Sequence, residues 1–237
     1  MNYLLSSLPN SMRHHLLRHA VQVEVTQGTV LHEPYEQPRF AYFPLRGVCS
    51  MMTRTRSGHA VETGMLGSES CTGATYLMGQ AEVPSLYVQQ VTGVSLRVPY
   101  TDLRDGFRSS EPLRDRILEL VQVWSLTMGQ LIACQRLHQT EQRLARWLLM
   151  VRQRSNDDAF QLSHEFLAEM LGCGRPKITL LLLAFRESGL VDSERNGSIR
   201  LRDVPRLQAL ACECHTVITE LYAGLYKTPD EDKLVTS

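Results

Sequence analysis

The sequence predicts an α+β protein: an N-terminal antiparallel β-roll of jelly-roll-like layout, one long helix, and a C-terminal winged helix-turn-helix. Three observations predict this fold. Between residues 21 and 99, short segments with the pattern of β-strands are separated by glycine and proline residues. Apolar residues then fall on helical spacing, without such punctuation, over residues 111–137. Further along, two short helical stretches are separated by Gly-Cys-Gly and followed by an Asn-Gly turn.

Composition excludes several classes of protein. The chain has 25 basic residues (Lys and Arg) and 25 acidic residues (Asp and Glu), so any contact with a polyanion has to be local. The N-terminus lacks the basic and apolar segments of a secretory signal. The sequence also contains no run of about 18 apolar residues, the length that would predict a membrane span. Its 6 scattered cysteines fit a reducing compartment better than a secreted disulfide scaffold. We therefore expect a cytoplasmic protein with no membrane partner.

Residues 1–110 are expected to form the β-roll domain, which begins with a short amphipathic helix at the N-terminus. Valines alternate with polar residues over 21–25, and Gln27-Gly28 turns the chain into the next run. Regular turn signals at this spacing predict an antiparallel barrel or roll. The later runs lie at residues 41–43, 48–53, 87–91 and 94–98.

Residues 111–138 are expected to form one long helix that mediates dimerisation. Its apolar stripe is wider than the roll alone would cover, and a long helix with an apolar seam commonly packs against its own copy across a two-fold axis. Gly129 allows the close approach of a partner backbone. The alternative is a helix that packs only on its own domain, and we favour the homodimer.

Residues 139–227 are expected to form the winged helix-turn-helix domain. Ser163 can accept a hydrogen bond from the free amides at the start of a helix. Gly172-Cys173-Gly174 ends that helix, and Arg175-Pro176 begins the next, because first-turn amides have no partner that proline would remove. Asn196-Gly197 predicts a small hairpin behind the second helix, which makes the motif a winged variant.

The end of the chain combines cysteines with helical spacing. Cys212-Glu213-Cys214-His215 suggests metal ligation, but residues two apart on a helix point to different sides. A packed helix over residues 207–221 is the better interpretation, so we expect no metal site and no cofactor. Residues 228–237 are expected to form a flexible tail.

The stretch from Phe166 to Val191 resembles the Crp/Fnr superfamily of bacterial transcription regulators, and it reads FLAEMLGCGRPKITLLLLAFRESGLV. With the roll and the long helix before it, the resemblance covers nearly the whole chain. It implies a cyclic-nucleotide-binding-like roll, a homodimer formed along the long helix, and a winged helix that reads a palindromic operator in double-stranded DNA. It also implies RNA polymerase as a candidate partner, and it implies no enzyme activity.

The resemblance assigns DNA contacts to residues of the motif. Arg175 matches an arginine that pairs with guanine, a bidentate contact that is favoured in the major groove. Ser163 matches a phosphate-contacting hydroxyl. Pro176 and Leu180 stand where cyclic-AMP-binding members carry Glu and Arg, so this chain should read a different base sequence. For Lys177 and Thr179, a role as ordinary surface residues is about as well supported. The predicted DNA-binding residues are Ser163, His164, Arg175, Pro176, Lys177, Thr179 and Leu180.

The effector pocket of cyclic-AMP-binding members is matched only in part. Gly67 and Glu69 resemble their ribose-binding Gly-Glu pair, but Pro84 stands where an arginine would neutralise the cyclic phosphate, and Ser85 alone is retained. Burying a phosphate without a cationic partner is costly. We therefore predict that cyclic AMP is not the effector. Gly67, Glu69 and Ser85 are candidates for a pocket that takes another small molecule, although for Glu69, a loop carboxylate, a structural role is slightly favoured.

Other functions fit the residues less well. An iron–sulfur sensor needs four thiolates, and only Cys49 and Cys71 precede the long helix. Haem ligation by a histidine stays a minor alternative. A metal-dependent enzyme of the cupin type would need ligands that the roll lacks, with only His59 and Glu62 near each other. The main alternative is a ligand-binding or protein-interaction module that keeps the fold without operator-specific DNA binding.

Overall fold

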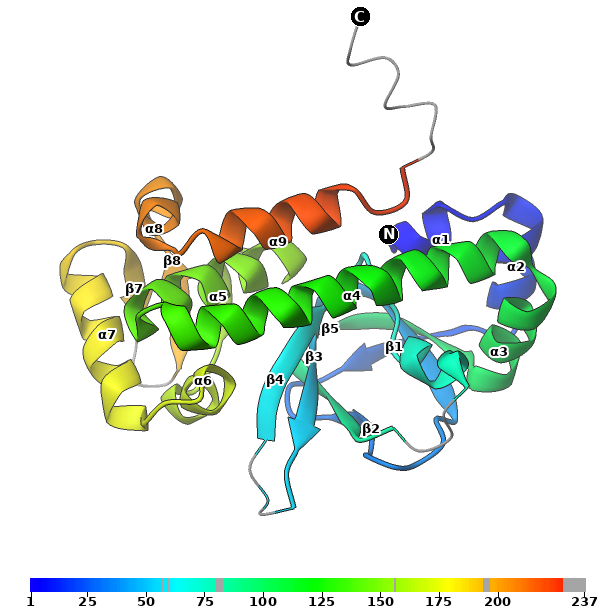
Figure 1. The fold of residues 1–237 in the computed structure, drawn as a ribbon, viewed down its shortest axis with the longest axis horizontal. Helices are drawn as coiled ribbons and strands as arrows, with labels where there is room; N and C mark the ends of the chain where they lie inside the picture. The colour runs from blue at the N-terminus through cyan, green and yellow to red at the C-terminus, as the bar shows by residue number, and fades with distance from the viewer. Residues whose placement is uncertain (57, 59, 80–82, 156, 194–196, 228–237) are drawn as a thin grey trace, which may run out of the picture.

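A five-stranded antiparallel sheet dominates the N-terminal half of the structure (Figure 1). The structure is a computed structural model, and it describes residues 1–227 apart from 57, 59, 80–82, 156 and 194–196. The strand order is β1-β5-β3-β4, and β2 also pairs with β5. The predicted antiparallel roll is confirmed. Its strands are β1 (Val21–Val25), β2 (Val30–His32), β3 (Phe40–Arg54), β4 (Ala60–Leu66) and β5 (Ser85–Pro99).

The runs predicted between residues 41 and 98 merge into two long strands, β3 and β5. Gly47 and Gly93, which the sequence suggests as turn residues, lie inside these strands where the pairing register shifts. A Cβ on Gly93 would lie 2.1 Å from the carbonyl oxygen of Arg46. These glycines therefore let two backbones approach closely, as at a β-bulge, rather than turning the chain. β4 lies outside the predicted runs because polar residues interrupt its apolar ones.

Short helices close one end of the roll. Two helices, α1 (Tyr3–Ser6) and α2 (Asn10–Leu17), replace the single N-terminal helix that the sequence predicts, because Pro9 separates them. A 3-10 turn, η1 (Ala74–Met78), and α3 (Tyr100–Ser109) complete this end. These segments bury apolar side chains of the roll in one cluster with the first half of the next helix.

The predicted long helix is α4 (Glu111–Leu137), which runs along the length of the molecule (Figure 1). The side chain of Ser110 caps it by accepting a hydrogen bond from the Leu113 amide. Its first half packs on the roll through the buried side chains of Leu113, Ile117 and Trp124. Only one stripe of α4 is used in this way.

The C-terminal part contains the predicted helix-turn-helix and hairpin. Its strands form a three-stranded sheet in the order β6-β8-β7, of which β6 was not predicted. The tip of the hairpin, where the sequence predicts the Asn-Gly turn, involves residues 194–196, which lie outside the described residues. The elements are α5 (Thr140–Ser155), β6 (Ala159–Gln161), α6 (His164–Leu171), α7 (Arg175–Glu187), β7 (Val191–Ser193) and β8 (Ser198–Leu201).

The helix predicted over residues 207–221 is interrupted. The structure has α8 (Val204–Leu210) and α9 (Cys214–Ala223), because Ala211 adopts an extended conformation (φ −65°, ψ 151°) and ends α8. Cys212 lies between the two helices. The expectation that one continuous helix carries both cysteines is therefore wrong. α9 packs along α4 (Figure 1).

One apolar cluster joins the roll to the C-terminal domain. Val48 and Met65 of the sheet pack in the same buried cluster as Trp147 of α5, and α6 packs against β4. Trp147 is 1% exposed, and its indole Nε1 donates a hydrogen bond to Glu62 Oε1 at 3.0 Å. The two halves of the molecule therefore share a core.

Glu62 makes this contact sensitive to pH. Burial raises its pKa from 4.5 to about 7, against the opposing effects of a hydrogen bond from Ser50 and of the nearby Arg146. When folding raises the pKa of a carboxyl, the free energy of unfolding of the protein falls as the pH rises. The fall extends from the pKa of the carboxyl in the unfolded chain through its pKa in the folded protein. Between pH 5 and pH 8, we expect the free energy of unfolding of the wild type to fall by about 1–3 kcal/mol more than that of Glu62→Gln. Urea titrations at the two pH values measure this difference, and an equal pH dependence of the two proteins would contradict it.

Candidate nucleic-acid interface

Local sequence signals set the geometry of α6 and the turn after it. Ser163 Oγ accepts a hydrogen bond from the Phe166 amide at 3.1 Å, as predicted for the residue that begins α6. Gly172 ends the helix with φ +60°, a left-handed conformation that favours glycine. Pro176 lies in the first turn of α7. The two helices are therefore joined by a short, well-defined turn.

The second helix, α7, has one buried and one exposed face. Ile178, Leu182 and Phe185 are at most 1% exposed and pack into the apolar cluster of the C-terminal domain. On the other face, Leu180 is 67% exposed. This outward face can therefore contact another molecule while the inner face anchors the helix.

The exposed start of α7 is cationic. Arg175, Pro176 and Lys177 are all exposed. Neither basic side chain forms an ion pair with any residue that the structure describes. The free amides of the first turn add partial positive charge at the same place. Together these groups suit phosphate oxygens and the acceptor edges of bases.

A hydrogen-bond chain holds α6 and α7 together at this end. The Thr179 hydroxyl donates to the carbonyl oxygen of Arg175 at 3.2 Å, and His164 Nδ1 lies 2.9 Å from Thr179 Oγ1. Because the hydroxyl has one proton, His164 Nδ1–H is the donor in the second bond. Burial and the nearby Arg175 lower the pKa of His164 below its usual value, which favours the neutral ring. His164 and Thr179 therefore orient the start of α7.

Ser163 lies beside a cavity that it shares with residues of the roll. It lines a cavity of about 480 Å³ whose other walls include Val30, Met52 and Leu86 of the sheet. Ser163 itself is exposed at the rim. The sequence gives no sign of this cavity, because its walls come from segments far apart in the chain.

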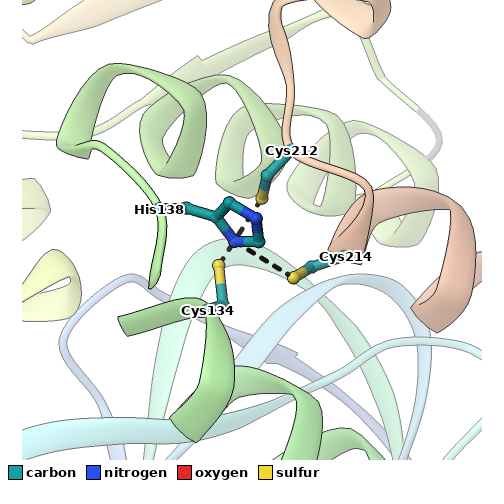
Figure 2. Close-up of side chains that lie close together, drawn as sticks. All are labelled: Cys134, His138, Cys212 and Cys214. Atoms are coloured by element: carbon teal, nitrogen blue, oxygen red, sulfur yellow. Dashed lines mark hydrogen bonds between the residues drawn. The ribbon is translucent and has the colours of Figure 1, made fainter. Parts of the chain in front are cut away.

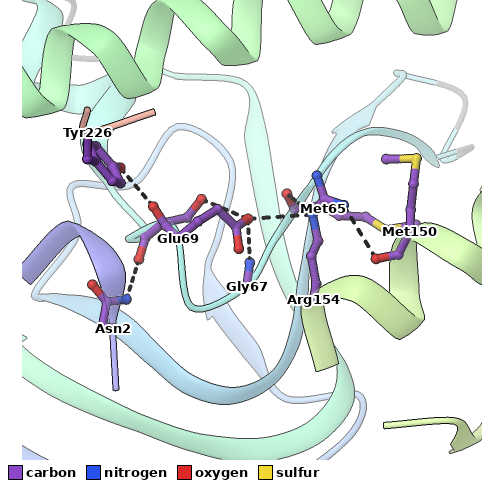
Figure 3. Close-up of polar contacts among 8 residues, drawn as sticks. Asn2, Met65, Gly67, Glu69, Met150, Arg154 and Tyr226 are labelled. Carbon is purple, nitrogen blue, oxygen red and sulfur yellow. Dashed lines mark hydrogen bonds and ion pairs between the residues drawn. The ribbon is translucent and has the colours of Figure 1, made fainter. Parts of the chain in front are cut away.

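Glu69, a candidate effector residue, lies in a polar network that joins the two halves of the molecule (Figure 3). Its Oε1 accepts a hydrogen bond from the Gly67 amide at 3.0 Å and forms an ion pair with Arg154 Nε at 3.5 Å. The Tyr226 hydroxyl donates to the Glu69 carbonyl at 2.7 Å. Since Arg154 belongs to α5 and Tyr226 follows α9, this network supports the structural interpretation of Glu69.

The strand register places Ser85 and the end of β4 at different points along β3. Ser85 pairs with Thr53 across β5 and β3, whereas Leu66, at the end of β4, pairs with Cys49. Thr53 is four residue steps along the strand from Cys49, a distance of about 13 Å. Ser85 therefore lies at a different place along β3 from the end of β4, after which Gly67 and Glu69 follow.

Four side chains that the sequence analysis did not combine lie close together: Cys134, His138, Cys212 and Cys214. The expectation that Cys212 and Cys214 point apart is wrong, because Cys212 precedes α9. His215 is not part of the group. The usable sequence signal was the spacing of Cys134 and His138, which places two metal-binding residue types one helical turn apart.

Comparisons with known proteins agree with this geometry. Residues 142–210 match the model of the Crp-like helix-turn-helix domain. No curated protein matches the chain. A transcriptional regulator of the Crp/Fnr family from Eubacterium rectale is similar in structure, with 19% identity and a TM-score of 0.65 over 87% of this chain and 96% of that one. FixK2 from Bradyrhizobium japonicum is 13% identical, with a TM-score of 0.67 over 81% of this chain and 98% of its own.

A third solved structure shares the fold. The c-di-GMP-responsive global regulator CLP of Xanthomonas campestris is 16% identical, with a TM-score of 0.64 over 82% of this chain and 100% of its own. At these identities the likeness is one of fold. It extends over the roll, the long helix and the C-terminal domain together.

Proposed function

The chain has the fold of the Crp/Fnr transcription regulators and carries a Crp-like helix-turn-helix DNA-binding domain, and from this premise we propose that it is a cytoplasmic homodimer that regulates transcription from a palindromic operator. The exposed, cationic start of α7 is the observation that carries the proposal. A winged helix of this kind places the start of its second helix in the major groove. We propose no catalytic role.

The outward face of α4 supports a dimer. A subset of its exposed residues follow each other at alternating steps of four and three, the spacing of a two-helix coiled coil. Ile132 is 73% exposed and Leu118 is 45% exposed. No atom lies within 4 Å of a Cβ built on Gly129, so a second backbone has room there. The residues of this seam are Leu118, Gln122, Ser125, Gly129, Ile132 and Arg136.

The apolar composition of α4 is also that of a membrane-spanning helix. Within the part of the chain that the structure describes, α4 is long and apolar enough to cross a membrane by length and composition, although 33% of that window is buried inside the fold. The buried stripe packs on the roll, and the exposed stripe has the spacing of a dimer seam. We therefore propose that these two uses account for its composition.

Each exposed residue of the motif has a contact that suits its chemistry. We assign Arg175 to a bidentate contact with guanine, and Leu180 to apolar contact with a thymine methyl group. Lys177 and Ser163 suit phosphate oxygens, which position the domain without reading sequence. His164 and Thr179 support Arg175 through their hydrogen-bond chain, and Pro176 fixes the first turn.

A selection of bound sequences from random DNA tests the proposal directly. With the full chain, we expect an inverted repeat whose half-sites lie about 10–10.5 base pairs apart, or a multiple of that, as a two-fold dimer requires. Running the selection with and without a metabolite extract reports whether an effector is needed. If no sequence is enriched in either arm, the chain is an interaction or ligand-binding module that keeps the fold without operator binding.

Cyclic AMP should not bind the roll. Pro84 occupies the position expected for the phosphate-binding arginine, and Arg154, the cation beside Glu69, is already paired with it. We expect isothermal titration of the full chain with cyclic AMP to give no heat beyond dilution. Binding in the micromolar range or tighter would contradict this. An effector of other chemistry, and RNA polymerase as a second partner, are compatible with the proposal.

A further inference from the structure

Four potential metal ligands from separate segments converge at one point (Figure 2). Cys134 lies in the last turn of α4 and His138 directly follows that helix, while Cys212 and Cys214 flank the turn that begins α9. The three sulfurs and an imidazole nitrogen all lie within 4.8 Å of one another. Cys134 Sγ is 3.5 Å from Cys212 Sγ, and Cys214 Sγ is 3.5 Å from His138 Nδ1.

The backbone explains why these side chains meet. Cys134 and His138 are one helical turn apart, and the His138 amide still bonds to the Cys134 carbonyl although His138 itself is extended. The break between α8 and α9 frees Cys212 from helical geometry. Its side chain can therefore point to the same place as that of Cys214. The three cysteines are buried and form an apolar cluster of their own, apart from the two main cores.

We propose that Cys134, His138, Cys212 and Cys214 bind one Zn²⁺ ion. Three thiolates and one imidazole are a donor set of structural zinc sites, which are four-coordinate and closed. Zinc–sulfur bonds of about 2.3 Å place tetrahedral sulfurs about 3.8 Å apart, close to the shortest separations seen here. With all four positions filled by protein, the ion has no open position for catalysis.

Neighbouring groups complete the site. The Gln130 side-chain amide donates to Cys214 Sγ at 3.1 Å. With His138 Nδ1 facing the sulfurs, its Nε2 lies 3.9 Å from Glu213 Oε1, on the side where a carboxylate commonly orients a metal-binding histidine. Three thiolates and Zn²⁺ leave one negative charge. The buried guanidinium of Arg146 interacts electrostatically with Cys134 and Cys212, and its Nε has no hydrogen-bond partner among the described residues.

A disulfide, an iron–sulfur cluster or plain apolar packing would each account for the four side chains less completely than zinc does. A disulfide between Cys134 and Cys212 would need the two sulfurs to move together, and it would give Cys214 and His138 no role. An iron–sulfur cluster places several iron atoms between its thiolates, and so needs them farther apart than these are. Cysteines do pack as small apolar residues, but a polar imidazole nitrogen beside them is then unexplained.

The site would connect two parts of the fold that the chain separates. The bound ion would link the end of α4 to the start of α9, next to the connection between α4 and α5. A bound ion therefore fixes the direction in which the chain leaves the long helix. This stabilises the junction between α4 and the helix-turn-helix domain.

Metal content of the full chain tests the proposal. The protein is purified under reducing conditions without chelator, and we expect one zinc per chain by mass spectrometry of the metals. After removal of zinc with a chelator and reductant, anaerobic addition of Co²⁺ should give the visible bands of tetrahedral cobalt and a thiolate-to-cobalt charge-transfer band, saturating at one equivalent. Iron with acid-labile sulfide in anaerobically purified protein would overturn the proposal, as would a metal-free chain with a Cys134–Cys212 disulfide.

Variants assign the ligands. Cys214→Ser and His138→Ala should lower zinc content at least tenfold, whereas His138→Cys should restore binding with four sulfurs. Cys173→Ser is the matched control, because Cys173 is a partly exposed cysteine outside the cluster, and it should keep full zinc content. Retention of zinc by Cys214→Ser would overturn the proposal. If that variant fails to fold, absence of the cobalt bands in the reduced wild-type chain would overturn it equally.

Discussion

Arg175→Ala should lower operator discrimination by about 1–3 kcal/mol at one base pair of each half-site. The side chain is exposed at the start of α7. Its loss removes two N–H donors whose hydrogen bonds the O6 and N7 atoms of a guanine would accept. For the proposed operator of two half-sites, the total cost is about 2–6 kcal/mol if the two contacts are independent. Gel-shift titrations on the selected operator and on operators changed at single base pairs measure the effect.

Lys177→Ala provides the comparison for this prediction. Lys177 is exposed beside Arg175, but a lysine that contacts phosphate carries no sequence information. Its removal should weaken binding to all sequences alike and reduce the salt slope by about 1. If Arg175→Ala binds its operator unchanged, or weakens all sequences equally, Arg175 does not read a base.

Ile132→Glu should convert the proposed dimer to a monomer and weaken operator binding by a factor on the order of 100 or more, because binding at one half-site would no longer favour binding at the other. Ile132 is 73% exposed in the single chain, so the charge does not disturb the fold itself. Across a two-fold seam, however, it would bring two carboxylates together where the proposed dimer packs two isoleucine side chains. Sedimentation equilibrium and operator titrations of the same samples report both effects.

Leu137→Glu is the matched control for Ile132→Glu. Leu137 is 74% exposed, nearly the same as Ile132, but it lies about 140° further round the helix. We expect this variant to remain a dimer with normal operator affinity. If both variants dimerise normally, the copies meet through another surface. If both dissociate, the interface is broader than the seam.

Features set by neighbouring residues were predictable from the sequence. The start of α6 at Ser163, the left-handed turn at Gly172 and the proline in the first turn of α7 depend on backbone chemistry within a few residues. The long helix was predictable for a similar reason, since helical periodicity is a local pattern. The exposure of Arg175 and Lys177 followed from these elements.

Features set by distant contacts were not predictable. Gly47 and Gly93 suggest turns, but they serve a close approach between β3 and β5 that no local pattern reveals. The separation of Ser85 from the end of β4 depends on strand register. Cys134 and Cys212 are 78 residues apart in the chain, and their meeting depends on the break before α9. In each case, packing between distant segments decided the outcome.

The shared apolar cluster around Trp147 limits how this molecule can change shape. Side chains of the sheet and of α5–α7 pack together in one buried apolar cluster. Interlocked packing of this kind has discrete arrangements and resists gradual deformation. A signal received at the roll would therefore move the DNA-reading helices in a single step, from one interlocked state to another, and a population of molecules would respond by changing the fraction in each state.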